Sequence, residues 1–577
     1  MDLHSKLDPA RLAADSRLTL LLFLLSLPAH PSWQTAPSAT AQIAEVKKLY
    51  DEGRWEDVAQ AVPESAEQPA DLELYRGLAL AKLARWDEAE RAFEAGRAGN
   101  PRDGRFLVEL AGIAYRRKEF SKVKIELRQA LAISPRDDYS NDFLASIYFL
   151  EGNLEAALKY WNRTGKPKLT DLSFDPRPTL HPLILDRVFA FSPGAVWHRD
   201  LYLKTCAQLD ALDLFPRIRY DLEAQPDGAF NLEVQATERN GWGNTKWEGL
   251  VSLLRGLPYQ SVYPEFYNLD REGVNWRSFV RWDDEKRRIF TEIAAPLRKN
   301  PKWRFRVDFD RRNENWDLTS TLLPSLSSPA SVNMEKAAAG ASFQFIPNGN
   351  WQWNAGAEYS YREFRNLRGI PAKAAPFFTN GSAIALHLSV QRSLVRFPER
   401  RFTLNSGATG EIGTFFEDPL GRYARVEGFL ESNWLPQARG DDYQMQASLR
   451  GEGTFGKVPL DGLFMLGFER DNSLWLRGHP GLRDGEKGNA PLGRNYVLAN
   501  WGLDKIIHKD SLFTVKMGPL LDTGRIYDPS GLFGSPKWLW DTGLQLKVRV
   551  LGSFEFVLGY GKDLRSGNNS FFSTVSR

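Results

Sequence analysis

Residues 241–577 of this 577-residue chain alternate apolar and polar side chains, and this pattern limits the possible folds more than any other feature. In residues 303–310 one face carries Trp303, Phe305, Val307 and Phe309, and the other carries Arg304, Arg306, Asp308 and Asp310. Successive side chains of a β-strand point to opposite faces, so such a segment predicts a strand with one apolar face. The pattern recurs along the whole region and predicts a large β-structure.

The apolar face of residues 351–361 is aromatic at both ends, at Trp351 and Tyr361, and small in the middle, at Ala355 and Ala357. Ten steps of about 3.3 Å, tilted by about 40°, rise roughly 25 Å, which is the height of the apolar band of a transmembrane barrel. Aromatic rings at both ends of the band are typical of the two membrane interfaces. These features favour a membrane barrel over a soluble β-sandwich, which also alternates.

The region holds sixteen candidate strands, from Lys246–Leu254 to Phe571–Val575. They begin near residues 246, 259, 274, 288, 303, 337, 351, 383, 402, 424, 443, 496, 513, 538, 553 and 571. An even number allows an antiparallel barrel to close with both ends of the chain on one side. We therefore predict a sixteen-stranded antiparallel transmembrane β-barrel over residues 241–577.

A long turn-rich segment within Val458–Asp504 separates the eleventh and twelfth candidate strands. A loop of this length without secondary structure is usually functional or disordered. Its lead-in is Leu466-Gly467, and Leu521 to Gly524 lie downstream on a later strand. Leu476, Arg477, Gly478 and His479 lie near the centre of the loop, and Asp522 and Gly524 lie on that strand; the family resemblance given below makes these six the candidate site residues.

The N-terminus predicts export from the cytoplasm. Arg17 precedes an apolar run from Leu18 to Leu27 that is too short to span a bilayer comfortably. The small residues Ala39 and Ala41 follow in a pattern typical of signal-peptide cleavage. We therefore expect residues 1–41 to be a signal peptide and Gln42 to be the first mature residue.

Residues 42–167 contain a repeat of about 34 residues. Val58, Ala89, Val123 and Ala157 occupy equivalent positions, spaced by 31, 34 and 34 residues. The pattern resembles the tetratricopeptide repeat (TPR), whose helix pairs stack into a solenoid with a concave surface. A groove for a peptide or a partner protein would be lined by Tyr75, Tyr115, Arg116, Asp142 and Tyr148. The alternative is a spacer that only orients the next domain.

Residues 168–240 predict a small α/β module in the order β-α-α-β-β. Two strands flank a turn at Pro226-Asp227-Gly228, and two helices precede them, over 180–189 and 199–212. The order, with the segment Phe191 to Gly194, resembles a polypeptide-transport-associated (POTRA) domain. Modules of this kind can bind extended peptides at a sheet edge. A rigid linker is the alternative.

The motifs of residues 168–577 together resemble the BamA/TamA outer-membrane assembly and two-partner secretion superfamily. The resemblance implies that the loop folds into the barrel lumen and that Arg477 meets Asp522 on the inner wall. His479 replaces the aromatic residue usual in that family. It also implies a bacterial outer membrane location, with the TPR and POTRA modules in the periplasm.

Three functions remain open from the sequence. The first is assembly or translocation of polypeptides at the outer membrane, with the barrel opening between its first and last strands. The second is a secretion pore for one dedicated passenger. The third is a barrel-anchored TPR scaffold. The partners implied are outer-membrane lipids, unfolded or secreted polypeptides, and a periplasmic protein bound by the TPR.

The amino-acid composition and the absence of catalytic motifs exclude several classes of function. A formal charge of +3, from 75 basic and 72 acidic residues, gives no reason to expect a nucleic-acid partner. One cysteine, Cys206, permits no intrachain disulfide. The seven histidines and this cysteine form no spaced cluster, and no serine elbow or phosphate loop occurs. We therefore expect no enzyme activity, no metal site and no cofactor.

Overall fold

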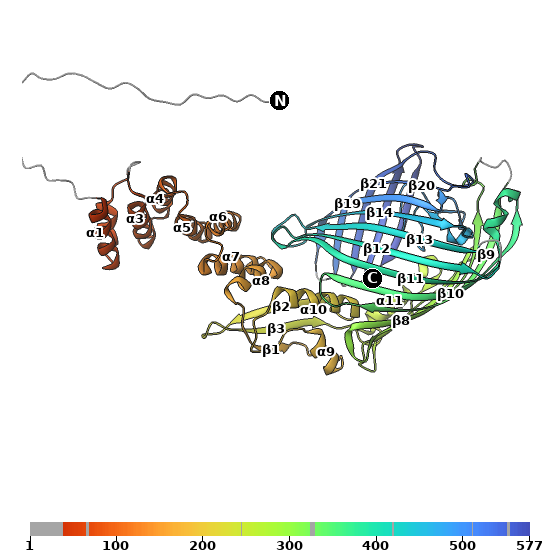
Figure 1. Ribbon diagram of the computed structural model, residues 1–577, viewed down its shortest axis with the longest axis horizontal. Coiled ribbons are helices and arrows are strands. Elements are labelled where there is room, and N and C mark those ends of the chain that lie inside the picture. The colour runs from red at the N-terminus through yellow and green to blue at the C-terminus, as the bar shows by residue number, and fades with distance from the viewer. Residues whose placement is uncertain are drawn as a thin grey trace, which may run out of the picture. The chain divides into compact units, whose positions relative to one another are not determined.

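The computed structural model describes residues 39–64, 68–243, 245–323, 329–417, 421–510, 512–550 and 554–576 (Figure 1). The chain forms two compact units, one ending at Ile113 and the other beginning at Ala114. Most of the expected signal peptide lies outside the described residues, and Ala39 to Ala41 begin the first helix. No helix among the described residues is long and apolar enough to cross a membrane.

Up to residue 161, the described part of the chain folds into eight α-helices that follow one another in pairs, which confirms the helical N-terminal region. They are α1 (Ala39–Asp51), α2 (Trp55–Ala61), α3 (Ala70–Lys82), α4 (Trp86–Gly99), α5 (Gly104–Arg116), α6 (Phe120–Ile133), α7 (Asp138–Leu150) and α8 (Leu154–Trp161). Within the first unit, the Phe93 ring of α4 packs so closely on Gly77 of α3 that an added Cβ would lie 2.4 Å from it. A small residue at position 77 is therefore what lets these two helices approach.

The α/β module has the predicted element order. Its elements are β1 (Leu169–Phe174), α9 (Pro182–Val188), α10 (Arg199–Leu212), β2 (Arg217–Ala224) and β3 (Phe230–Thr237). β3 lies in the middle of the sheet, parallel to β1 and antiparallel to β2. Trp197, Leu212 and Leu232 are fully buried between the sheet and the helices.

The remaining strands form an antiparallel barrel. The wall consists of β4 (Ser261–Val262), β5 (Glu265–Leu269), β6 (Val274–Trp282), β7 (Lys286–Leu297), β8 (Asn300–Asp317), β9 (Ser331–Phe345), β10 (Trp351–Arg368), β11 (Gly381–Phe397), β12 (Phe402–Phe415), β13 (Arg422–Trp434), β14 (Tyr443–Gly456), β19 (Asn495–Lys509), β20 (Phe513–Tyr527), β21 (Leu539–Val550), β22 (Phe554–Asp563) and β23 (Asn569–Ser576). Each strand pairs with the next, β4 and β5 both pair with β6, and β23 lies beside β4 to close the ring. We call the junction of β23 with β4 and β5 the seam.

The two faces of the wall have opposite polarity, as the alternation predicts. On β8, Trp303, Val307 and Phe309 are between 41% and 51% exposed on the outside. Arg304 and Asp310 of the same strand are less than 10% exposed on the inside. An apolar outer surface around a charged interior is the polarity of a barrel surrounded by lipid.

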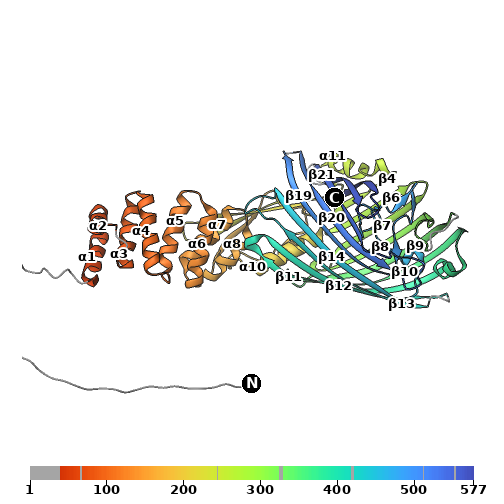
Figure 2. The ribbon, with the colours of Figure 1, turned by 90° about the horizontal axis from the view of Figure 1, so that it is seen from above.

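The prediction of a first strand at Lys246–Leu254 is wrong, because this segment is helix α11 (Lys246–Leu254). Thr245 caps the helix by accepting a hydrogen bond from the Glu248 backbone N–H at 3.1 Å, which satisfies an otherwise unpaired donor. α11 packs against β4 and β5, and Figure 2 shows it next to β4. The other fifteen candidate strands correspond to wall strands, if β4 and β5 count as one.

The polarity of α11 is inverted relative to a helix on a soluble protein. Trp247, Leu250, Val251 and Leu254 share one face and are between 36% and 75% exposed. Glu248 and Ser252 are buried against the barrel instead. The apolar face of the helix therefore adds to the apolar outer surface of the wall.

The α/β module is fixed to one rim of the barrel. Asn268 donates to Glu238 Oε1 at 2.9 Å, and Asn275 donates to the Leu212 carbonyl at 2.8 Å. Helix α8 is bound to the same rim, because Lys159 and Tyr160 both hydrogen-bond to Glu399 in the turn between β11 and β12. The last helix pair, the module and the barrel are thus parts of one compact unit.

Candidate functional site: the loop inside the barrel

Residues 457–494, which we call the lumenal loop, connect β14 to β19 and lie inside the barrel. Apart from one short 3-10 turn, their regular structure is limited to the two-residue strands β15 (Phe464–Met465), β16 (Leu482–Arg483), β17 (Glu486–Lys487) and β18 (Leu492–Gly493). Leu466, Leu474 and Leu476 of the loop pack with Tyr496, Leu498 and Ile526 of the wall in a small apolar cluster. The rest of the loop is held by polar contacts.

Arg477 is bound to Asp522 of β20, as the resemblance implies. Its Nε and Nη2 lie 2.8 and 2.5 Å from the two oxygens of the Asp522 carboxylate, and its backbone N–H donates to the same carboxylate at 3.0 Å. Nη1 also donates to Gln545 Oε1 at 3.1 Å. The Asp522 side chain is fully buried, so this bidentate pair is removed from solvent.

Gly478 and Gly561 let the loop backbone lie directly on the wall. The Gly478 N–H donates to Asp541 Oδ2 of β21 at 2.6 Å, and a Cβ on Gly478 would lie 2.7 Å from the Asp541 carboxyl carbon. A Cβ on Gly561 of β22 would lie 2.0 Å from the Arg477 carbonyl oxygen. The same carbonyl accepts a hydrogen bond from Ser570 Oγ of β23 at 2.6 Å. Only glycine fits at either position.

His479 adds polar contacts to β21 and β22. Its Nδ1 lies 3.0 Å from Asp541 Oδ1, and its Nε2 lies 3.5 Å from Asp563 Oδ2 of β22. Each ring nitrogen therefore faces its own carboxylate, and a protonated imidazole satisfies both. The same three side chains offer their donor atoms within 4.8 Å, so they are also the set that could hold a metal ion among the described residues.

The remaining predicted residues fix the position of the loop through close packing contacts. Leu466 is fully buried in the apolar cluster, and a Cβ added to Gly524 would lie 3.1 Å from the Leu466 Cδ1 atom, which leaves little room for a larger residue. An added Cβ on Gly467 would lie 2.3 Å from the Ala490 methyl group. Leu476, Gly467 and Gly524 thus act through packing, whereas Arg477, Gly478 and His479 make the polar attachment.

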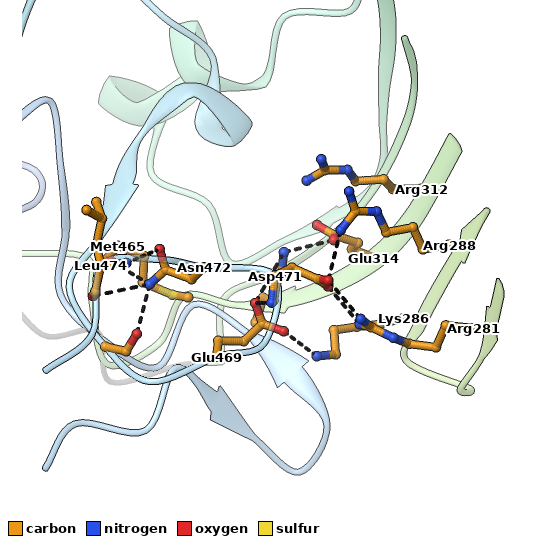
Figure 3. Close-up of polar contacts among 12 residues, drawn as sticks. Arg281, Lys286, Arg288, Arg312, Glu314, Met465, Glu469, Asp471, Asn472 and Leu474 are labelled. Carbon is orange, nitrogen blue, oxygen red and sulfur yellow. Dashed lines mark hydrogen bonds and ion pairs between the residues drawn. The ribbon is translucent and has the colours of Figure 1, made fainter. Parts of the chain in front are cut away.

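A second attachment, which sequence reasoning missed, holds the loop to the opposite side of the seam (Figure 3). Asp471 accepts hydrogen bonds from Arg281 of β6 at 2.7 and 2.8 Å and from Arg288 of β7 at 2.9 Å. Glu469 accepts from Lys286 of β7 at 2.7 Å. The acidic residues are visible in the sequence, but their partners lie on strands more than 180 positions earlier and carry no local motif.

Between these two attachments, the loop runs along the seam itself. The Phe468 ring lies 4.9 Å from the Phe572 ring of β23, between centroids. Arg470 lies over the ring of Tyr259, which precedes β4. Tyr259 is in turn hydrogen-bonded to Ser573 of β23 through their hydroxyl groups at 2.6 Å. The loop therefore contacts both edges of the seam from the inside.

The five groove residues predicted in the helical region have different environments. Tyr148 is 1% exposed and stacked on Tyr160, so its assignment to a binding groove is wrong. It fills the core between α7 and α8 instead.

The other four predicted groove residues are not buried in this core. Tyr115 is 42% exposed, and Asp142 forms an ion pair with Lys166 at 3.0 Å on the surface. Arg116 is exposed, while Tyr75 packs against Tyr50 in the first unit.

No known protein-family profile matches the sequence, and no curated protein matches it. The chain is similar to several solved structures. BamA from Haemophilus ducreyi lacking POTRA domains 1–3 shares 11% identity over 71% of this chain and 84% of that chain, with a TM-score of 0.41. CdiB from Escherichia coli shares 10% identity over 71% and 77%, with a TM-score of 0.46. CdiB from Acinetobacter baumannii shares 12% identity over 71% and 73%, with a TM-score of 0.43.

Proposed function

We propose that this chain is an outer-membrane β-barrel protein that assists the insertion or translocation of polypeptides by opening at its seam. The observation that carries the proposal is the attachment of the lumenal loop to both sides of that seam. Arg477 and His479 bind the side of β20–β22, and Glu469 and Asp471 bind the side of β6 and β7. A loop placed in this way braces the seam when it is bound and permits opening when it is released.

The seam strands are short, which supports opening at this position. β4 has two residues and β23 has eight, whereas β8 and β10 each have eighteen. A hydrogen bond contributes about 0.5–1.5 kcal/mol net, so parting short strands costs less than parting any two long neighbours. β4 and β5, not the predicted Lys246–Leu254, form the first edge of the opening.

The N-terminal parts fit the delivery of polypeptides to this barrel. We assign the helix pairs to a TPR solenoid and residues 168–240 to a POTRA-like module, both on the periplasmic side. β2 is an edge of the module's sheet, so an extended client can add to it through backbone hydrogen bonds. The module's attachment to the rim places that edge on the same unit as the barrel.

A secretion pore is the second candidate, and one feature of the lumen favours it. A cavity of about 370 Å³ lies beside the loop, between Trp475, Arg477 and the inner wall of β12–β14. A larger cavity of about 730 Å³ shares Asn405 and Glu431 with it and reaches the α/β module. Together they mark a polar route along the wall opposite the seam.

Photo-crosslinking in living cells tests the proposal and separates the two candidates. A photoreactive residue replaces Arg219, an exposed position on the edge strand β2, and a control replaces Arg365 at the far end of β10. Crosslinks from position 219 to many unfolded barrel proteins support insertion, and crosslinks to one passenger support secretion. Equal capture from both positions contradicts a client-binding role of the module.

A further inference from the structure

The larger cavity, of about 730 Å³, lies between helix α10 of the α/β module and the inner wall of the barrel. It is rich in arginine, and the six around it are Arg239, Arg277, Arg304, Arg306, Arg392 and Arg396. Five acidic side chains also line it, so the total charge alone does not identify a ligand. The pairing of these charges is more informative.

Four of the five acidic residues already have cationic partners. Asp213 binds Arg239 and Arg277, Glu155 binds Arg199 and Arg396, Glu265 binds Arg255, and Glu431 binds Arg450. The fifth is Asp210 of α10, and burial raises the pKa of its carboxyl group. Asp210 forms no ion pair with any of the six arginines among the described residues.

Arg304 is a buried cation of this cavity that has no direct partner for its charge among the described residues. Its residue is only 9% exposed, and its Nε is buried without a hydrogen bond. Within the part of the chain that the structure describes, its guanidinium forms no ion pair. Burying an unpaired charge is unfavourable unless a counter-charge is supplied. A ligand in the cavity can supply it.

The neighbours of Arg304 add further positive charge. Arg306 lies two positions along β8 and so points to the same face. It shares the single carboxylate of Glu292 with Arg277, at 3.1 and 2.5 Å respectively. Arg392 of β11 lies over the Trp351 ring at 4.9 Å and has no carboxylate partner among the described residues. This side of the cavity therefore holds more guanidinium groups than acids to pair with them.

We propose that this cavity is a binding site for a phosphate group, with Arg304 as its main ligand. Guanidinium groups bind phosphate oxygens through two parallel hydrogen bonds, and a dianion can engage several of them at once. The phosphate belongs to a small soluble phosphate or to a phospholipid headgroup, since the chemistry recognised is the same. The site goes beyond the proposed function, because it requires neither a client nor an open seam.

Thermal unfolding of the purified full chain in a phosphate-free detergent tests the site. The chain, Arg304→Gln and the control Arg311→Gln are each measured in sodium chloride and in sodium phosphate at equal ionic strength. Arg311 lies on the same strand but is paired with Glu335 on an exposed surface. A ligand that binds only the folded state raises the unfolding midpoint, so phosphate should stabilise the natural chain and Arg311→Gln but not Arg304→Gln.

Without phosphate, Arg304→Gln should unfold at the same temperature as the natural chain or a higher one, because a buried unpaired charge has been removed. Titration calorimetry should show at least tenfold weaker phosphate binding by Arg304→Gln. A parallel titration with dihexanoyl phosphatidylglycerol distinguishes the sources, and Arg304-dependent binding of either ligand supports the site. No stabilisation by either ligand, or equal stabilisation of all three proteins, overturns it.

Discussion

Asp471 accepts two hydrogen bonds from Arg281, at 2.7 and 2.8 Å, although the two residues are 190 positions apart. Arg281 lies on β6, next to the first edge of the seam, and Asp471 belongs to the lumenal loop. A few residues later, the same loop binds Asp522 of β20 through Arg477. The loop thus spans the seam from within, attached by a charged pair on each side.

Loss of the Asp471 carboxylate should destabilise the barrel. Asp471→Ala leaves Arg281 buried without a direct ion pair, because Arg288 keeps Asp310 as a second partner but Arg281 has no other ion pair among the described residues. The expected cost is about 3–5 kcal/mol in the free energy of unfolding, measured by urea titration in detergent. Glu363→Ala, which breaks an exposed pair with Arg365, should leave the free energy of unfolding nearly unchanged, because solvent screens the two charges. Equal effects of the two substitutions would contradict the anchoring role of Asp471.

Gly478→Ala should loosen the loop without changing the wall. The new methyl group would lie 2.7 Å from the Asp541 carboxyl carbon, so the loop backbone has to move away from β21. We expect a higher single-channel conductance in planar bilayers, because the loop no longer fills its side of the lumen. Gly410→Ala on β12 is the matched control, since a methyl group there meets nothing within 4 Å. Unchanged conductance of Gly478→Ala would show that the contact does not position the loop.

The Arg477 side of the loop could be predicted from the sequence because its residues occur in a short motif. The Asp471 side could not, because single acidic residues in a loop reveal nothing about which distant strand faces them.

Helix α11 was missed for a different reason. Its outward face is apolar, and a nine-residue apolar segment at the start of a barrel is also typical of a strand. The cap at Thr245 and the spacing of Trp247, Leu250 and Leu254 were the signals of a helix.

Two glycine substitutions in the helical region should have opposite effects. Gly77→Ala places a methyl group 2.4 Å from the Phe93 ring and should destabilise the first unit by roughly 1–3 kcal/mol through overpacking. Gly112→Ala lies inside α5 with nothing within 4 Å and should stabilise it by up to about 1 kcal/mol, because alanine favours the helix. Circular dichroism at 222 nm during heating measures both. Stabilisation by Gly77→Ala would contradict the close packing of α3 on α4.

Acid should release helix α8 from the rim of the barrel. Burial alone would raise the pKa of Glu399, but hydrogen bonds from Lys159 and Tyr160 outweigh it and lower that pKa. The contact therefore stabilises the docked state above the ordinary glutamate pKa of about 4.3, and this stability is lost as the pH falls below it. The protection of residues 154–161 from hydrogen–deuterium exchange, relative to the intrinsic rate at each pH, should fall between about pH 5 and pH 3. Glu399→Gln should show the fast exchange already at neutral pH, and protection equal to that of the natural chain would refute the contact.

Locking the seam tests the central claim most directly. Cysteines replace Tyr259 and Ser573, whose hydroxyl groups meet across the seam, and a short bifunctional thiol reagent joins them. Burial raises the pKa of the Cys206 thiol to about 12, which makes this natural cysteine react more slowly with the reagent than an ordinary exposed thiol. Ser432→Cys with Ala447→Cys, register partners on β13 and β14, is the control crosslink within the wall. The measurement is the amount of client protein assembled or exported in cells. Loss of activity with the seam crosslink alone is the predicted result, and full activity with the seam closed would contradict opening at this position.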